Sequence, residues 1–162
     1  MLDAERDVQA RLGDQPLDFD ANRAISNIYR AAAAVRRQAE RGLLSEFGLS
    51  WGGFTILWVL WVWGEMETAQ LATECDLAKG TLTGMLTTLE KRELVERTRS
   101  ETDGRRVLVS ATEAGTSMID ELFPRFNALE VDLTNGLSND EQKELSRLLR
   151  IVITNASPDD DA

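Results

Sequence analysis

The sequence predicts a mainly α-helical fold that contains one small β-hairpin. Over several long stretches of the 162 residues, apolar side chains recur at steps of three and four, which is the period of an amphipathic helix. The period changes to two over residues 95–110, on both sides of Asp103-Gly104, a dipeptide typical of a tight turn. The two periods together indicate helices that dominate the fold and a single two-stranded ribbon.

The N-terminal part of the chain is expected to contain an arm and two helices. Residues 1–16 are polar and charged and include glycine and proline breakers, so we expect a mobile or weakly helical N-terminal arm. Apolar residues at helical spacing predict a long helix over about 18–44. Ser50 then offers an N-cap for a second helix that runs through about Trp61.

The middle of the chain is expected to hold two further helices and the hairpin. Thr68 can cap a short third helix through about Cys75. A fourth helix is expected over residues 79–92, because leucines and a methionine line one of its faces. The hairpin of residues 95–110 follows this helix directly.

Two long helices and a tail are expected at the C-terminal end. Thr112 and Glu113 open the first of these helices, and Asn135-Gly136 closes it. Ser138 and Glu141 form a capping box for the last helix. Residues 156–162 are rich in aspartate and predict a solvated acidic tail.

The composition excludes several classes of function. The chain has no histidine and a single cysteine, Cys75, so we expect no His-based metal site, no His-based catalytic triad and no internal disulfide. No glycine-rich phosphate loop and no Gly-x-Ser-x-Gly motif is present, and we expect neither an enzyme, nor catalytic residues, nor a cofactor. The acidic start and the short longest apolar run, residues 54–63, predict a cytoplasmic protein without membrane contact.

The charge is unevenly distributed along the chain. The net charge is −10, which opposes binding to nucleic acid, but phosphate binding depends on local cationic patches. Residues 79–106 hold seven basic and five acidic residues, for a net of +2, and the other residues sum to −12. The segment that is not acidic therefore coincides with the fourth helix and the hairpin.

The order of helix, short helix, helix and charged hairpin predicts a winged helix-turn-helix. Such a domain places the helix that precedes the hairpin in the major groove of DNA. It can also place an arginine of the hairpin in the minor groove. We expect residues 79–92 to be the recognition helix and residues 95–110 to be the wing. The candidate DNA-binding residues are Lys79, Gly80, Thr81, Thr83, Thr87, Arg97, Arg99, Asp103, Arg105 and Arg106.

A set of short motifs in a fixed order resembles the MarR (multiple antibiotic resistance regulator) family. The motifs are Leu71-Ala72, Thr81-Leu82-Thr83, Leu89-Glu90, Leu94-Val95-Glu96-Arg97, Asp103-Gly104-Arg105-Arg106 and Val109 through Thr112-Glu113-Ala114-Gly115. The resemblance implies a DNA-binding domain over 50–113 and a helical dimerisation domain over 17–47 and 114–155. It also implies a homodimer that binds pseudo-palindromic double-stranded DNA and represses transcription until a small ligand releases it. Gly84 departs from the family, whose members often carry a long polar residue at this position.

Several of these residues also have a plainer interpretation. Arg105 is either a minor-groove contact oriented by Asp103 or a solvated hairpin arginine. The segment Lys79-Gly80-Thr81 either binds phosphate or is an exposed helix start. Cys75 is a candidate redox sensor, but Glu74 and Asp76 beside it favour a packed and unreactive thiol.

Aromatic residues supply a candidate ligand site. Small aromatic carboxylates and phenols are ligands in the resembled family, and Tyr29, Trp51, Phe54 and Trp58 could line a pocket for such an effector. The same residues stand at helical spacing, so core or dimer packing is the other interpretation. For the chain as a whole, the alternative function is a dimeric winged-helix interaction module that has lost DNA binding and acts on another regulator.

Overall fold

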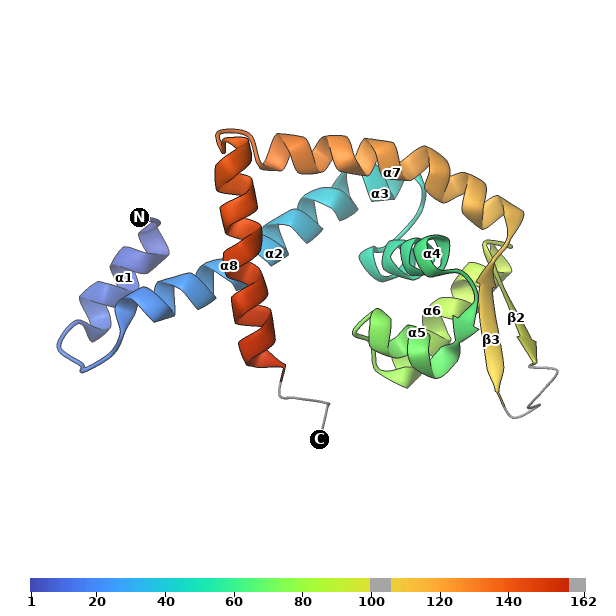
Figure 1. Cartoon of the computed structure of the whole chain (residues 1–162), viewed down its shortest axis with the longest axis horizontal. Coiled ribbons are helices and arrows are strands. Elements are labelled where there is room, and N and C mark those ends of the chain that lie inside the picture. The colour runs from blue at the N-terminus through green and yellow to red at the C-terminus, as the bar shows by residue number, and fades with distance from the viewer. Residues whose placement is uncertain (100–105, 158–162) are drawn as a thin grey trace. The chain divides into compact units, whose positions relative to one another are not determined.

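The computed structural model describes residues 1–99 and 106–157 of the chain. The prediction of a mainly helical fold with a small antiparallel sheet is confirmed (Figure 1). The elements in chain order are α1 (Asp3–Leu12), α2 (Phe19–Arg41), α3 (Leu43–Glu46), α4 (Trp51–Trp63), β1 (Met66–Glu67), α5 (Thr68–Glu74), α6 (Lys79–Lys91), β2 (Val95–Arg99), β3 (Val107–Ala111), α7 (Glu113–Leu133) and α8 (Asn139–Ala156).

The chain divides into two compact units, Met1–Leu122 and Phe123–Ala162. The division falls inside α7, next to Pro124, which has no backbone N–H to donate within the helix. The second unit contains the end of α7 and all of α8. Helix α8 begins with the predicted capping box, in which the Ser138 hydroxyl accepts a hydrogen bond from the Glu141 backbone and the Glu141 carboxylate accepts one from the Ser138 backbone.

The N-terminal segment was expected to be mobile or weakly helical, and in the structure residues 3–12 form helix α1. Glu5 stabilises it: one carboxylate oxygen accepts a hydrogen bond from the Leu2 backbone N–H at 2.6 Å, and the other accepts one from the Asn27 side chain on α2 at 2.7 Å. These hydrogen bonds lower the pKa of the Glu5 carboxyl, with the Asn27 bond as the largest cause. The contact with Asn27 spans 22 residues, which is why the polar composition of the segment did not reveal it.

The sheet contains a strand that the sequence pattern did not reveal. Strand β1 has only two residues and pairs antiparallel with β3, opposite to β2, so the order is β1-β3-β2. The register aligns Met66 with Val109, and Val95 with Ala111. Two residues are too few to show an alternating pattern.

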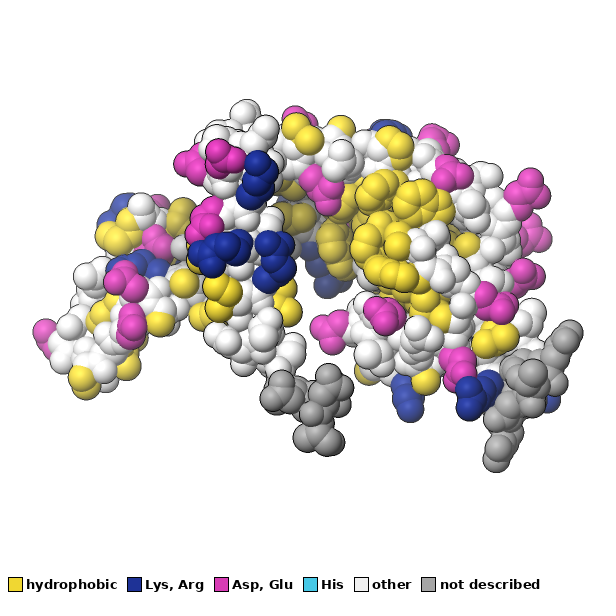
Figure 2. Space-filling model, viewed as in Figure 1, with side chains coloured by type: hydrophobic (Ala, Val, Ile, Leu, Met, Phe, Trp, Pro, Cys, Tyr) yellow, Lys and Arg dark blue, Asp and Glu magenta, His cyan; other side chains and the backbone are white. Residues whose placement is uncertain are grey.

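The core of the first unit is formed by α4, α5, α6 and the sheet, together with residues of α3 and the first part of α7. Helix α4 is apolar around most of its circumference, as expected for a buried helix, and it begins at Ser50, whose hydroxyl accepts a hydrogen bond from Gly53 at 3.2 Å. The side chains that are almost fully buried are Leu44, Ile56, Leu57, Val59, Leu71, Leu86, Val109, Ile119 and Leu122. The C-terminal end of α4 leaves this core, with Val62 and Trp63 45% and 56% exposed, and hydrophobic side chains gather over α4 in Figure 2.

Within the described part of the chain, no single helix combines the length and hydropathy of a membrane span. Phe19–Glu46 and Trp51–Trp63 reach those values only as a pair, and this pair is bent by 76°.

Candidate nucleic-acid interface

Helix α6 has one buried and one exposed face, as expected for a recognition helix. Leu82, Leu86 and Leu89 are buried against the core. The predicted residues on the opposite face, Lys79, Gly80, Thr81, Thr83 and Thr87, are all exposed. The structure therefore brings together the five predicted residues of this helix.

The N-terminus of α6 has the features of an anion-binding helix end. Its N-cap is Ala78, whose side chain has no acceptor for the free N–H groups of the first turn. Lys79 is the first helical residue and is exposed. Free N–H groups, the helix dipole and a lysine all attract a phosphate oxygen.

The threonines of α6 have their hydroxyl hydrogens engaged inside the helix. Thr83 donates to the Lys79 carbonyl at 2.8 Å and Thr87 donates to the Thr83 carbonyl at 2.9 Å. In this arrangement each threonine can offer outward only its oxygen lone pairs and its methyl group. Such groups suit base amino donors and the thymine methyl group in the major groove.

The arginines of the hairpin are partly engaged by acidic residues. The Arg97 Nε donates to Glu90 Oε1 at 2.8 Å, and Arg97 Nη2 donates to Glu90 Oε2, which completes a bidentate pair. The hydrogen bond from Arg97 lowers the pKa of the Glu90 carboxyl, and the same contact raises the pKa of Arg97. Arg106 donates to Glu67 at 2.6 Å. Arg99 is exposed at the end of β2, and Asp103 and Arg105 lie outside the described residues.

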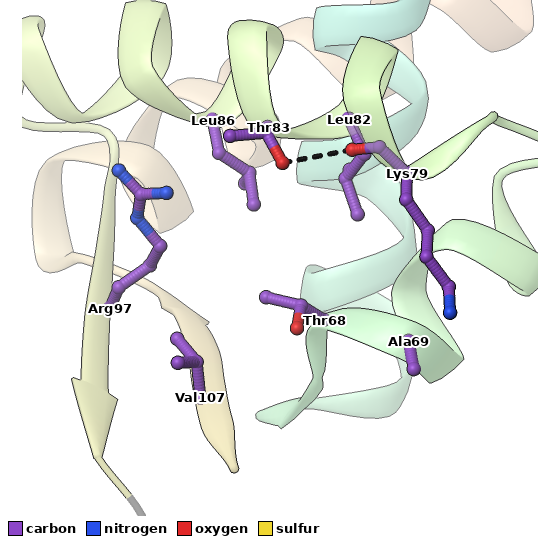
Figure 3. Close-up of a pocket in the computed structure, with 8 residues that line it drawn as sticks. All are labelled: Thr68, Ala69, Lys79, Leu82, Thr83, Leu86, Arg97 and Val107. Atoms are coloured by element: carbon purple, nitrogen blue, oxygen red, sulfur yellow. Dashed lines mark hydrogen bonds between the residues drawn. The ribbon is translucent and has the colours of Figure 1, made fainter. Parts of the chain in front are cut away.

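A cavity of about 340 Å³ lies between α5, α6 and the sheet (Figure 3). Thr68 and Ala69 of α5 border it on one side, and Arg97 of β2 and Val107 of β3 border it on the other. Arg97 reaches from the strand towards α6, where Glu90 accepts its hydrogen bonds. The pair of Arg97 and Glu90 therefore links the wing to the recognition helix.

The predicted aromatic ligand site is not gathered around one of the described cavities. Tyr29 is 74% exposed on α2, whereas Phe54 is only 5% exposed in the core. Trp51 packs edge-on against Phe54 with ring centroids 6.0 Å apart, and Trp58 packs in the same way against Trp63. The ligand site therefore stays a prediction.

Two further observations concern metal-ligating side chains and the cysteine among the described residues. They contain no cluster of three or more potential metal-ligating side chains. Cys75 caps the C-terminus of α5, and burial together with the neighbouring Glu74 raises the pKa of its thiol to about 11. Because the thiolate is the reactive form, this environment makes the thiol less reactive.

Sequence reasoning missed the residues that hold the recognition helix in place. Glu90 was recognised only as part of a motif, and the partners of Arg97 and Arg106 were not foreseen. Arg92 at the end of α6 donates to the carbonyl oxygens of Gly48 and Phe47, which are 44 and 45 residues away. Contacts over such separations depend on the tertiary fold, and no local pattern in the sequence signals them.

Known proteins share both this sequence and this fold. The family profile of the MarR family matches residues 49–107. The uncharacterized HTH-type transcriptional regulator YwaE of Bacillus subtilis is 38% identical over 154 residues, which cover 93% of this chain and 90% of that protein. A serine mutant of MarR from E. coli, solved in complex with operator DNA, is 26% identical, with a TM-score of 0.70 over 78% of this chain and 91% of that one.

A third comparison concerns the fold alone. A MarR family transcriptional regulator from Streptomyces coelicolor, solved in complex with DNA, is 21% identical and gives a TM-score of 0.80 over 90% of this chain and 94% of that one. The fold and the exposed face of α6 define a winged helix-turn-helix transcriptional regulator. The chain belongs to the MarR family, which confirms the resemblance seen in the sequence.

Proposed function

We propose that this protein binds pseudo-palindromic double-stranded DNA as a homodimer and represses transcription. In this proposal α6 enters the major groove and the β2–β3 wing reaches the adjacent minor groove, where Arg105 is the predicted contact. The observation that carries the proposal is the uncapped, lysine-bearing N-terminus of α6, which continues into an exposed face beside the hairpin. The complex of the E. coli relative with operator DNA supports it.

Exposed apolar faces on the long helices support the homodimer. No described residue of α8 is buried. Its apolar side chains Leu145, Leu148 and Ile151 are between 45% and 47% exposed. Only Ala39 is buried among the 23 residues of α2. Apolar helix faces of this kind call for a partner, and a second copy of the dimerisation segments, 17–47 and 114–155, would cover them. Sedimentation at micromolar concentration tests this, and a stable monomer would contradict it.

A salt titration of DNA binding tests the proposal directly. The full-length protein is titrated against the duplex upstream of its own gene and a scrambled duplex, and the affinity is followed by fluorescence anisotropy. Lys79→Ala should weaken binding to all duplexes and flatten the salt dependence by about two ions per dimer, one for each subunit. Lys143→Ala removes the same charge from α8, a helix outside the proposed DNA-binding elements, and should change neither quantity.

The wing requires a separate variant. Arg105→Ala should cost about 1–3 kcal/mol of operator binding while the melting temperature stays the same. If the parent protein shows no salt-sensitive and sequence-preferring binding, the alternative function, an interaction module that acts on another regulator, replaces the proposal.

Ligand response is the second part of the proposal. A small aromatic or phenolic effector near Trp51 and Trp58 should quench tryptophan fluorescence and lower DNA affinity by the factor by which DNA lowers ligand affinity. A panel of such compounds that shifts neither fluorescence nor melting temperature would argue against an effector of this class.

A further inference from the structure

The C-terminus of α6 is hydrogen-bonded to the segment that precedes α4. Arg92, the C-cap residue of α6, donates from Nη1 to the Gly48 carbonyl oxygen at 2.6 Å and from Nη2 to the Phe47 carbonyl oxygen at 2.8 Å. These carbonyls follow directly after α3, where a helix end leaves acceptors without helical partners. One guanidinium thus joins the end of α6 to the end of the α2–α3 segment.

The backbone at Gly48 is shaped for this contact. Gly48 has a φ of +62°, a left-handed conformation that residues with a side chain adopt at a cost. A Cβ at this position would lie 3.6 Å from the nearest nitrogen of the Arg92 guanidinium, which is ordinary van der Waals contact. The glycine therefore presents its carbonyl to Arg92 in a conformation that favours glycine.

The turn that follows α6 is also fastened to α7. The Glu93 carbonyl accepts a hydrogen bond from the Thr112 hydroxyl at 2.6 Å, and the Leu94 carbonyl accepts one from the Thr112 backbone at 3.1 Å. Residues 92–94, here called the α6–β2 turn, thus contact both the end of the α2–α3 segment and the beginning of α7. Of these partners, Phe47 is the last residue of the predicted dimerisation segment 17–47, and Thr112 lies two residues before the segment 114–155.

We propose that Arg92 is a positioning residue that sets the angle of the recognition helix, and thereby the spacing of DNA half-sites that the dimer accepts. This inference rests on the proposed function. Helix α6 has 13 residues and is about 20 Å long. A rotation of about 10° around its C-terminal end moves its N-terminus by about 3.5 Å, which is close to one base-pair step. A small loss of constraint at Arg92 is therefore enough to change which spacing fits.

The test compares spacing preference with salt dependence. A pseudo-palindromic duplex is selected from a random library with the full-length parent protein, and versions with one base pair added or removed at its centre are prepared. Arg92→Ala should bind the selected duplex about tenfold more weakly, because α6 loses the two charge-assisted hydrogen bonds within the protein that hold its C-terminal end. The ratio of its affinity for that duplex to its affinity for the altered spacings should fall towards one. Its salt dependence should match that of the parent, because no phosphate contact is removed.

Two further variants make the result decisive. Lys91→Ala removes the adjacent charge and should keep the spacing preference of the parent. Arg92→Lys keeps the charge but lacks the planar pair of donors that Arg92 directs at the two carbonyls, so it should show a smaller loss of spacing preference even if Arg92→Ala does not fold. If both Arg92 variants keep the spacing preference of the parent, the inference is overturned. It is also overturned if the salt dependence of Arg92→Ala is flattened by about two ions per dimer, because this would indicate a phosphate contact. If the parent selects no duplex, the proposed function fails first and the inference fails with it.

Discussion

Gly84 and Gly115 form a pair in which the same substitution by alanine should have opposite effects on stability. Gly84 lies inside α6 on its exposed face, and a Cβ built on it meets no heavy atom of the described residues within 4 Å. Alanine is favoured over glycine in a helix interior by about 1 kcal/mol. We expect Gly84→Ala to raise the free energy of unfolding by about this amount.

Gly115 lies in the first turn of α7, against the α6–β2 turn. A Cβ at Gly115 would lie 2.0 Å from the carbonyl oxygen of Leu94 and 3.0 Å from its carbonyl carbon. These are backbone atoms of a residue that is 3% exposed, so no side-chain rotation relieves the overlap. Overpacking of this kind costs about 3 kcal/mol, and about 1 kcal/mol returns as helix propensity. Gly115→Ala should therefore lower the free energy of unfolding by about 2 kcal/mol.

Thermal and urea denaturation of the full-length protein can measure both effects. Circular dichroism and tryptophan fluorescence should be recorded at one fixed protein concentration, because the stability of the proposed dimer would depend on concentration. For a chain of this size 1 kcal/mol corresponds to about 2–4 °C, so the two variants should melt about 6–12 °C apart. If Gly115→Ala melts at or above the parent, the close approach of α7 to Leu94 is not as described. If both variants shift in the same direction, the reasoning from local space fails.

Three other changes test individual features of the fold. Glu93 has a φ of +59°, so Glu93→Gly should raise the free energy of unfolding by about 0.5–1 kcal/mol in urea titrations, whereas Glu93→Ala should not. Arg97 lowers the pKa of Glu90 in the folded state, so this pair stabilises the fold above the ordinary carboxyl pKa of 4.5 and loses its effect as the pH falls below it. The melting difference between the parent and Glu90→Gln should accordingly be constant from about pH 8 to pH 6 and shrink towards pH 3. The raised pKa of Cys75 should make its alkylation at pH 8 at least about tenfold slower than that of a free cysteine.

The helices and the hairpin could be predicted because their signals are local. The apolar positions of α6 repeat at helical spacing, and the burial of Leu82, Leu86 and Leu89 confirms the face that they define. The caps at Ser50 and Ser138 involve partners three residues away, so sequence alone was enough to place the starts of α4 and α8. Periodicity and capping thus revealed the framework on which the interface is built.

The contacts that shape the interface could not be predicted, because they join residues that only the fold brings together. Arg97 was expected among the DNA-binding residues, but its bond to Glu90 depends on how β2 returns past α6. Arg92 could not be distinguished from any solvated arginine without the position of Gly48. The hydrogen bond that the Asn27 side chain donates to Glu5 likewise joins α1 to a residue that is distant in the sequence. The role of a charged side chain could therefore be assigned only with the structure, because the same residue type can be a solvated surface group, a DNA contact or a link between two distant segments.

The acidic partners on α6 and β1 bear on how a chain with a net charge of −10 can bind DNA. Because Glu90 and Glu67 engage Arg97 and Arg106, the attraction for phosphate falls mainly on the start of α6 and on Arg99 among the described residues. At about 0.15 M salt the screening length is about 8 Å, so the acidic remainder of the chain is screened from DNA while the local contacts persist. At about 0.01 M salt the screening length grows to about 30 Å, and repulsion from the whole chain reaches the duplex. As the salt concentration is lowered, the logarithm of the binding constant should therefore rise less steeply below about 0.05 M salt than above it. A straight line over the whole range, measured by anisotropy, would show that the acidic surface does not oppose binding.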